Sequence, residues 1–308
     1  MNRVVITNRH KEEFNALVDS IFAGKNKKLA KKVDKKIKWE ITKDTLNTLL
    51  QKKLKNFDSK ISFDKLIIAD FKYIKSLKEY IDNNQKRVEL LENEKDYFLT
   101  LYGRLKKSQY IKTFGVNVCL YCNRNYIFNF KKAKSLEATG QLDHFFDKKS
   151  YPYLAISLYN LVPCCSTCNQ RKSTKQSDIL HPFVDNFDKR AKFTLKIKNS
   201  SFYYSTDGFE ININPIDSKD TQVKNSIDIF NLNRLYQNHQ DIILELIQKD
   251  VVYNESYLDE LYKKYEGTLF KNKEDLQRFI SGGYIEEEQI NRRPLSKLIK
   301  DITQELGL

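Results

Sequence analysis

Two Cys-x-x-Cys pairs constrain the fold of this chain more than any other feature. Cys119 and Cys122 form the first pair, and Cys165 and Cys168 form the second. Two short turns of this kind commonly present four thiolates to one tetrahedral Zn²⁺ ion. A shared ion would hold together two segments that are far apart in the sequence. Cys164 is left over, and we expect it to be buried without binding metal, although it could replace Cys165 at a less regular spacing.

The alternative role for these cysteines is a disulfide framework or a redox pair. The residues after Met1 contain no apolar leader-like run, and the chain contains no apolar run of membrane-spanning length. We therefore expect a cytoplasmic protein without a membrane partner, whose thiols stay reduced and bind zinc. Because four cysteine ligands leave no open position on the ion, this zinc would be structural, and a catalytic metal would need other ligands.

A carboxylate and an imidazole stand side by side at Asp143 and His144. The segments Tyr126–Phe130 and Leu136–Phe146 predict a two-stranded hairpin whose second strand ends at this pair. Adjacent side chains of a strand point to opposite sides, so a bend is expected if Asp143 binds a cation while His144 stays free. Near pH 7 an imidazole can accept a proton, and a hard divalent cation prefers oxygen ligands. The pair therefore supplies a base and a metal ligand.

A short helix is predicted from Ser166 to Lys175, after Asn160. Its first turn would carry the second cysteine pair and Asn169, which gives the order strand, strand, helix around one metal site. Arg171 and Lys172 lie on the same helix, where they would either hold a flanking phosphate or form an ordinary solvated face.

This arrangement, over residues 118 to 175, resembles the HNH endonucleases with their ββα-metal fold. The resemblance implies that His144 is the general base and that Asp143 and Asn169 bind Mg²⁺ or Mn²⁺. It also implies that Asn160 braces the loop and the imidazole. The implied reaction is hydrolysis of DNA phosphodiester bonds with one catalytic metal.

The charge distribution favours a polyanionic partner at one end of the chain. The formal net charge is +14. Residues 1–117 carry 27 basic and 15 acidic side chains, residues 118–190 carry 11 and 6, and residues 191–308 carry 16 and 19. We therefore expect DNA to bind the first two regions, and the acidic, helical last third to serve as a scaffold or to dock a protein partner.

The most basic segment, Gly24–Lys38, contains eight lysines and one aspartate. Apolar residues recur in it every four positions, which predicts a helix with a broad cationic face. Its predicted phosphate contacts are Lys28, Lys31, Lys32 and Lys35. A solvated helix or a flexible basic arm, without a DNA contact, is the alternative.

The overall prediction is an α+β protein. Residues 1–117 form a basic helical region with helices over 9–23, 43–54, 64–82 and 86–109, and residues 118–190 form the zinc-stapled nuclease core. Residues 191–308 begin with alternating apolar residues that predict a small antiparallel meander, and helices resume near residue 219.

The wider arrangement resembles the HNH subunits that accompany ATPases in bacterial anti-phage systems such as Septu. That resemblance implies a partner ATPase. Two other classes remain open: a non-catalytic zinc ribbon that binds nucleic acid, and an HNH nuclease acting on RNA or in a mobile element. His181 could approach the metal or be structural, and we expect no catalytic role for His10 or His239.

Overall fold

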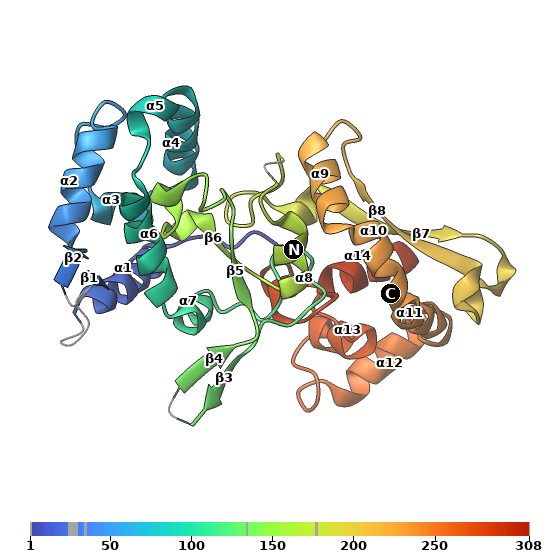
Figure 1. The fold of residues 1–308 in the computed structure, drawn as a ribbon. Coiled ribbons are helices and arrows are strands. Elements are labelled where there is room, and N and C mark those ends of the chain that lie inside the picture. Colours follow the sequence, from blue (N-terminus) through green and yellow to red (C-terminus); the bar gives the residue numbers. More distant parts are fainter. Residues whose placement is uncertain (1, 24–29, 34–35, 134, 176–177, 308) are drawn as a thin grey trace.

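The computed structural model describes residues 2–23, 30–33, 36–133, 135–175 and 178–307. Helices of the first third lie at one side of the molecule, and residues from β7 (Ala191–Ile197) onward lie at the other (Figure 1). Between them lie β5 (Gln141–His144), β6 (Leu161–Cys164) and α8 (Ser166–Lys172). The mixture of helices and small antiparallel strand pairs confirms the predicted α+β class. The first-third helices are α1 (Asn8–Phe22), α2 (Lys43–Leu54), α3 (Phe63–Ile68), α4 (Phe71–Asn83), α5 (Gln85–Val88), α6 (Glu92–Arg104) and α7 (Lys107–Thr113).

Two predicted helices of this region are divided into shorter ones. The helix expected over 64–82 breaks between α3 and α4, where Ala69 is extended and the Asp70 carboxylate caps α4 by accepting the Tyr73 backbone N–H at 2.8 Å. The helix expected over 86–109 becomes α5, α6 and α7. Apolar periodicity continues across these breaks because the short helices pack into one core, so periodicity alone did not locate the caps.

The prediction of a lysine-rich helix at residues 24–38 is wrong, because those of its residues that the structure describes form strands. β1 (Ala30–Val33) pairs antiparallel with β2 (Lys36–Glu40), so Lys31 and Lys32 lie on a strand. Lys28 and Lys35 lie outside the described residues. A spacing of four fits a strand repeat of two as well as a helix repeat of 3.6, and the β-branched and aromatic residues here favour strands.

The central segment forms two separate hairpins instead of the one predicted. β3 (Asn129–Lys132) pairs with β4 (Ser135–Ala138), whereas β5 (Gln141–His144) pairs with β6 (Leu161–Cys164). The break falls at Gly140, where a Cβ atom would approach Ile127 Cβ to 2.8 Å. The strand that ends in Asp143 and His144 therefore pairs with the segment just before the second cysteine pair. Helix α8 (Ser166–Lys172) follows β6 and confirms the predicted short helix.

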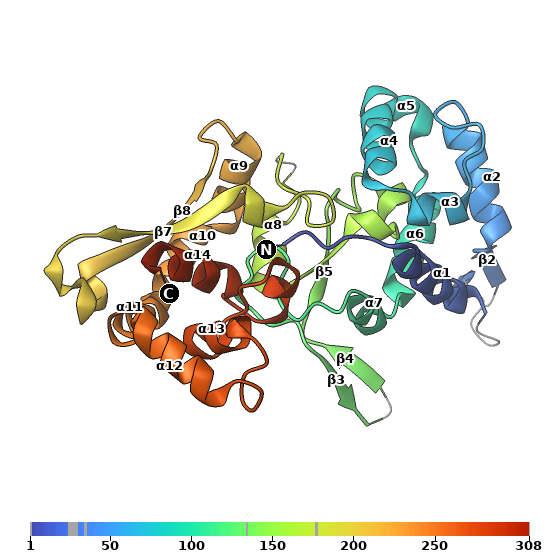
Figure 2. The ribbon, with the colours of Figure 1, turned by 180° about the vertical axis from the view of Figure 1, so that it is seen from behind.

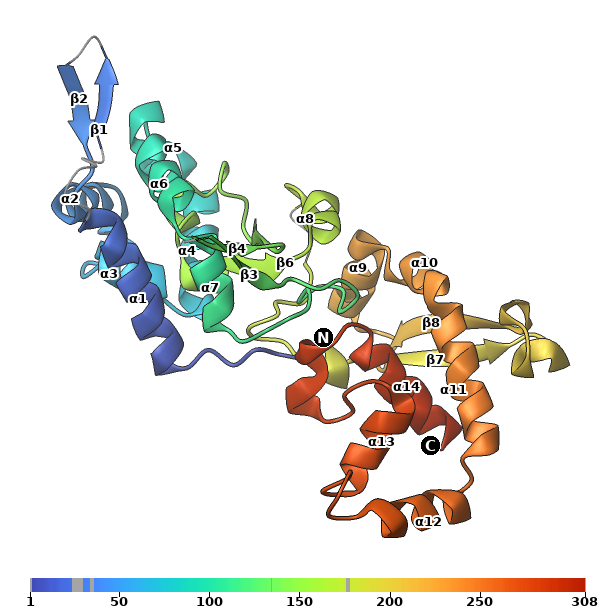
Figure 3. The same cartoon turned by 90° about the horizontal axis from the view of Figure 1, so that it is seen from below.

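The C-terminal third begins with the expected antiparallel strands. β7 (Ala191–Ile197) pairs with β8 (Phe209–Pro215), and Phe193 lies opposite Ile213. Helices then follow, and α12 lies at the margin of the molecule in Figure 3. They are α9 (Thr221–Phe230), α10 (Leu232–Tyr236), α11 (Gln240–Val252), α12 (Glu255–Tyr265), α13 (Lys273–Ser281) and α14 (Ser296–Leu306). Short 3₁₀ helices connect several elements: Pro152–Leu154, Leu158–Asn160, Phe187–Lys189, Ser200–Tyr203, Thr206–Gly208, Gln237–His239 and Glu287–Arg292.

One buried apolar cluster runs from α1 through the central strands to α14. Helix α14 packs across β7, as Figure 2 shows from behind, and its Leu298 and Ile302 are fully buried. The final helix is therefore part of the core, which fits the scaffold alternative for this helix rather than the docking surface. Within the described residues, no helix is both long enough and apolar enough to cross a membrane.

Candidate functional site

The four predicted zinc ligands meet in the structure. The Sγ atoms of Cys119, Cys122, Cys165 and Cys168 all lie within 4.8 Å of one another, and all four residues are buried. Thiolates that bind one zinc at about 2.3 Å lie about 3.8 Å apart, so the cluster fits a structural zinc ion in number, kind and spacing. Cys164 is buried on β6 and is not part of the cluster, as expected.

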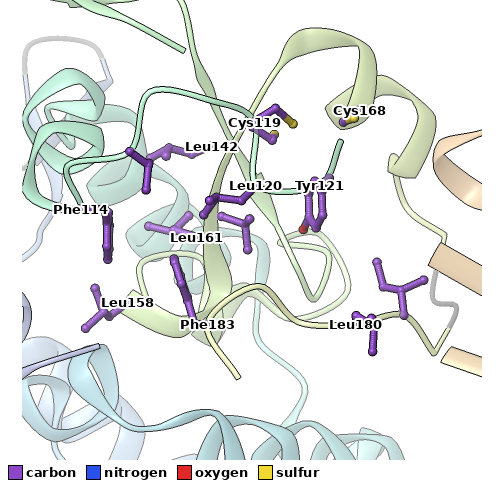
Figure 4. Close-up of a cluster of buried hydrophobic side chains, with 14 of the residues drawn as sticks. Phe114, Cys119, Leu120, Tyr121, Leu142, Leu158, Leu161, Cys168, Leu180 and Phe183 are labelled. Atoms are coloured by element: carbon purple, nitrogen blue, oxygen red, sulfur yellow. The ribbon is translucent and has the colours of Figure 1, made fainter. Parts of the chain in front are cut away.

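The first cysteine pair is held by the C-terminal third of the chain. The Tyr236 hydroxyl donates to the Cys122 carbonyl at 2.6 Å, and the Asn123 amide donates to the Ile290 carbonyl at 3.0 Å. Asn123 has a positive φ of 51°, which turns the chain after Cys122. Figure 4 shows Cys119 and Cys168 beside the apolar cluster that includes Leu120, Leu142 and Leu161. Hydrogen bonds with the C-terminal third therefore fix the turn that carries Cys122.

Asp143 lies in a buried polar cluster. Its Oδ2 accepts a hydrogen bond from the Tyr121 hydroxyl at 2.7 Å and lies 3.0 Å from the Lys172 ammonium. Burial raises the pKa of the Asp143 carboxyl, and the charge of Lys172 opposes that rise. Sequence analysis missed Tyr121, although its position inside the first cysteine pair placed it beside the site.

The side chain of His144 contacts other residues than Asp143 does. Its Nε2 lies 3.0 Å from the Ala155 carbonyl oxygen, and its ring packs edge-on against Tyr102 of α6 with centroids 4.3 Å apart. A carbonyl can only accept, so Nε2 carries the proton and Nδ1 of the neutral ring is the acceptor. Burial lowers the pKa of His144 to about 3. β5 keeps regular pairing at both positions, so the expected bend is not seen there.

Asn160 is fully buried at the end of the loop that follows β5. Its amide donates to the carbonyls of Phe146 and Leu154, at 3.0 and 2.9 Å, and its Oδ1 accepts the Phe146 N–H at 2.6 Å. These bonds hold both ends of the loop next to Ala155, the residue that binds the His144 ring. This geometry agrees with the predicted bracing of the loop and the imidazole by Asn160. The catalytic role of Asn160 stays a prediction.

The three predicted residues of α8 have different surroundings. The Asn169 amide donates to Gln141 Oε1 at 2.7 Å. Gln141 lies two residues before Asp143 on β5, so the two side chains are on the same face of the strand. Lys172 is 2 % exposed and donates to the His144 carbonyl at 2.8 Å, in addition to its pair with Asp143. The alternative of an ordinary solvated face is therefore wrong for Lys172, because its ammonium is enclosed, and its phosphate contact stays a prediction. Arg171 remains half-buried, and no contact assigns it a role.

The other histidines lie outside this cluster. His181 is fully buried, with Nε2 donating to the Tyr159 carbonyl at 2.8 Å and its ring 4.2 Å from that of Phe71. His10 packs against Phe114, and His239 accepts a hydrogen bond from Arg124. His181 therefore has a structural environment, in line with the second of its two predicted roles.

Comparison with known proteins gives one informative similarity. The chain is 30 % identical over 122 residues to the Septu protein PtuB of Bacillus thuringiensis. The match covers 39 % of this chain and 38 % of that protein, so it spans well under half of either. No family model and no solved structure matches the chain.

Proposed function

We propose that this protein is a metal-dependent HNH endonuclease that hydrolyses DNA phosphodiester bonds. The observation that carries the proposal is the pairing of β5 with β6 next to the four-cysteine cluster at the start of α8, with Asp143 and His144 at the end of β5. A non-catalytic zinc module has no need for a buried neutral imidazole beside a carboxylate.

The proposed base is Nδ1 of His144. The Ala155 carbonyl holds the proton on Nε2, and the lowered pKa keeps the ring neutral at pH 7. The ring would take a proton from a water whose oxygen attacks phosphorus while the bond to the 3′ oxygen breaks. Solvent would then return a proton to the leaving oxygen.

A divalent cation would be held by the Asp143 carboxylate and the Asn169 side-chain oxygen. These oxygen donors suit Mg²⁺ or Mn²⁺ in kind. Oδ2 of Asp143 is engaged by Tyr121 and Lys172, whereas Oδ1 lies 3.4 Å from the Lys172 ammonium and is the less occupied oxygen. When bound, such an ion neutralises negative charge on the phosphate in the transition state.

The similarity to PtuB supports a place in an anti-phage defence system of the Septu kind. We propose that the protein acts there with an ATPase subunit, as the resemblance of the whole arrangement implies. If an ATPase is encoded beside this protein, co-expression of the two followed by size-exclusion chromatography tests this part. Separate elution of the two proteins at micromolar concentration would count against the partnership.

The decisive experiment is plasmid cleavage with Mg²⁺ or Mn²⁺. His144→Ala should lower the rate by about a hundredfold or more, the usual scale for a lost general base. Because His144 is buried, zinc content and melting temperature are measured on the same sample, and His144→Asn provides a second variant closer in size. An equally active, folded His144→Asn protein would remove the residue from the mechanism.

The second candidate is a non-catalytic zinc protein that binds nucleic acid. The buried pair of Lys172 and Asp143 favours it, because an ammonium already neutralises the proposed metal ligand. DNA binding by the wild-type protein, with no cleavage under any divalent cation, would support this candidate.

A further inference from the structure

Two lysines from different parts of the chain meet beside His144. Lys107 is the first residue of α7, and Lys148 lies in the loop after β5. Their Nζ atoms lie 4.9 and 4.5 Å from the centroid of the Tyr102 ring. The same ring packs edge-on against the His144 imidazole at 4.3 Å. Tyr102 thus places two ammonium groups next to the proposed base.

Neither ammonium has an ion-pair partner among the described residues. Asp147 is adjacent in sequence, but its Oδ2 accepts the backbone N–H groups of Lys149 and Ser150 at 3.1 and 3.0 Å. Burial lowers the pKa of Lys148, the charge of Lys107 lowers it further, and the charge of Asp147 opposes both. A phosphate bound beside the Tyr102 ring would offset the repulsion between the two ammonium groups.

We propose that Lys107 and Lys148 form a phosphate clamp that positions the DNA backbone beside His144. This proposal rests on the proposed function, and it also specifies where the DNA substrate would lie. The Lys172 ammonium is enclosed with Asp143, so other cations would have to bind an outer phosphate. The two lysines reach the site from the helical first third and from the β5 loop. DNA would therefore lie across the junction of α7 with the nuclease core.

The test compares Lys107→Gln, Lys148→Gln and the double variant with two matched controls. Lys106→Gln and Lys149→Gln remove the neighbouring lysines, which are both exposed. Each protein also carries His144→Ala, so that binding is measured without cleavage. A fluorescent duplex DNA is titrated at several salt concentrations. Each clamp lysine that contacts a phosphate should flatten the slope of log K against log salt by about 0.9.

A second arm measures cleavage with His144 intact. The double variant should raise KM about tenfold at physiological salt, while kcat changes little because Asp143 and His144 are untouched. Lys148→Arg should keep the salt slope, since it keeps the charge. Melting temperatures of the clamp variants should match those of the controls.

The two hypotheses fail separately in this design. If the double variant has the same salt slope and KM as the controls, the clamp is wrong, whatever the enzyme does. If wild type cleaves no DNA but the double variant still flattens the slope, the clamp stands as a DNA contact and the nuclease proposal fails.

Discussion

Lys172 and Asp143 form a buried ion pair at the end of β5, and its electrostatics affect the stability of the folded protein. Both side chains are nearly inaccessible, at 2 % and 4 % exposure. Taking two charges out of water costs several kcal/mol, and their attraction returns this only when further hydrogen bonds complete the geometry. Tyr121 and the His144 carbonyl supply those bonds. Removing one partner leaves the other charge enclosed and uncompensated.

Lys172→Met should therefore lower the free energy of unfolding by about 3–5 kcal/mol, the usual cost of breaking a buried pair. Combining it with Asp143→Leu should recover much of that loss, because no buried charge remains. Urea unfolding of the single and double variants measures both effects. Arg171→Met, one residue away and half-buried, is the control. A Lys172→Met protein as stable as this control would contradict the pairing.

His181 is the second buried group with a defined protonation state. Its Nε2 donates to Tyr159 and its Nδ1 accepts the Phe183 N–H at 3.2 Å, so the neutral ring satisfies both neighbours. Burial lowers the pKa of His181 to about 3, whereas an unfolded histidine titrates near 6.5. The unfolded state therefore binds a proton first as pH falls. Stability from this group is complete above pH 6.5 and is lost as pH falls toward 3.

Between pH 7 and pH 5, His181 should lower the free energy of unfolding by about 2 kcal/mol. Urea unfolding at both pH values gives this quantity. The same measurement on His181→Gln should show a smaller loss, because its amide does not titrate. If the two proteins lose stability in parallel, the lowered pKa is wrong.

At the scale of elements, the four-cysteine cluster joins the loop before β3 to the start of α8. Helix α8 has only seven residues, too few to be stable alone in water. Zinc binding would supply folding free energy to this helix and to the β5–β6 pair beside it. Cys164 offers a matched comparison, since it is equally buried but outside the cluster.

Cys168→Ser should lose bound zinc and unfold the region around β5, β6 and α8. Cys164→Ser should keep about one zinc per chain, because it removes no ligand. Elemental analysis gives the metal content, and circular dichroism follows the folding of each variant. Equal zinc content in the two proteins would overturn the ligand assignment.

At the scale of the whole molecule, the helices of the acidic last third differ in burial. Helix α14 is in the core, and its Lys297 pairs with Asp188 and Asp301 in a buried network. The backbone N–H of Lys297 also donates to Asn123 Oδ1, next to the cysteine pair. Helix α12, in contrast, contains no buried residue. Helix α12 is therefore exposed, whereas α14 is covered by the core.

Leu298→Ala should lower the free energy of unfolding by about 2–5 kcal/mol, because it opens a cavity beside β7. Leu269→Ala should change it by less than about 0.5 kcal/mol, since Leu269 is 69 % exposed. Chemical denaturation of both variants provides the comparison. Equal effects would mean that α14 is not packed into the core.

The sequence by itself determined the four-cysteine cluster, the short helix after it, and the alternating strands β7 and β8. The helix and the strands depend on residue types and spacings within a few positions, and the cluster depends on the preference of four thiolates for one metal ion. The tertiary structure decided which strands pair, because β5 meets β6 only after the chain turns at Gly140 and returns through the loop braced by Asn160. It also decided that Lys172 is enclosed while Lys107 and Lys148 meet over Tyr102. A helix face has no fixed exposure until another element covers it, so burial and long-range contacts are properties of the packed chain.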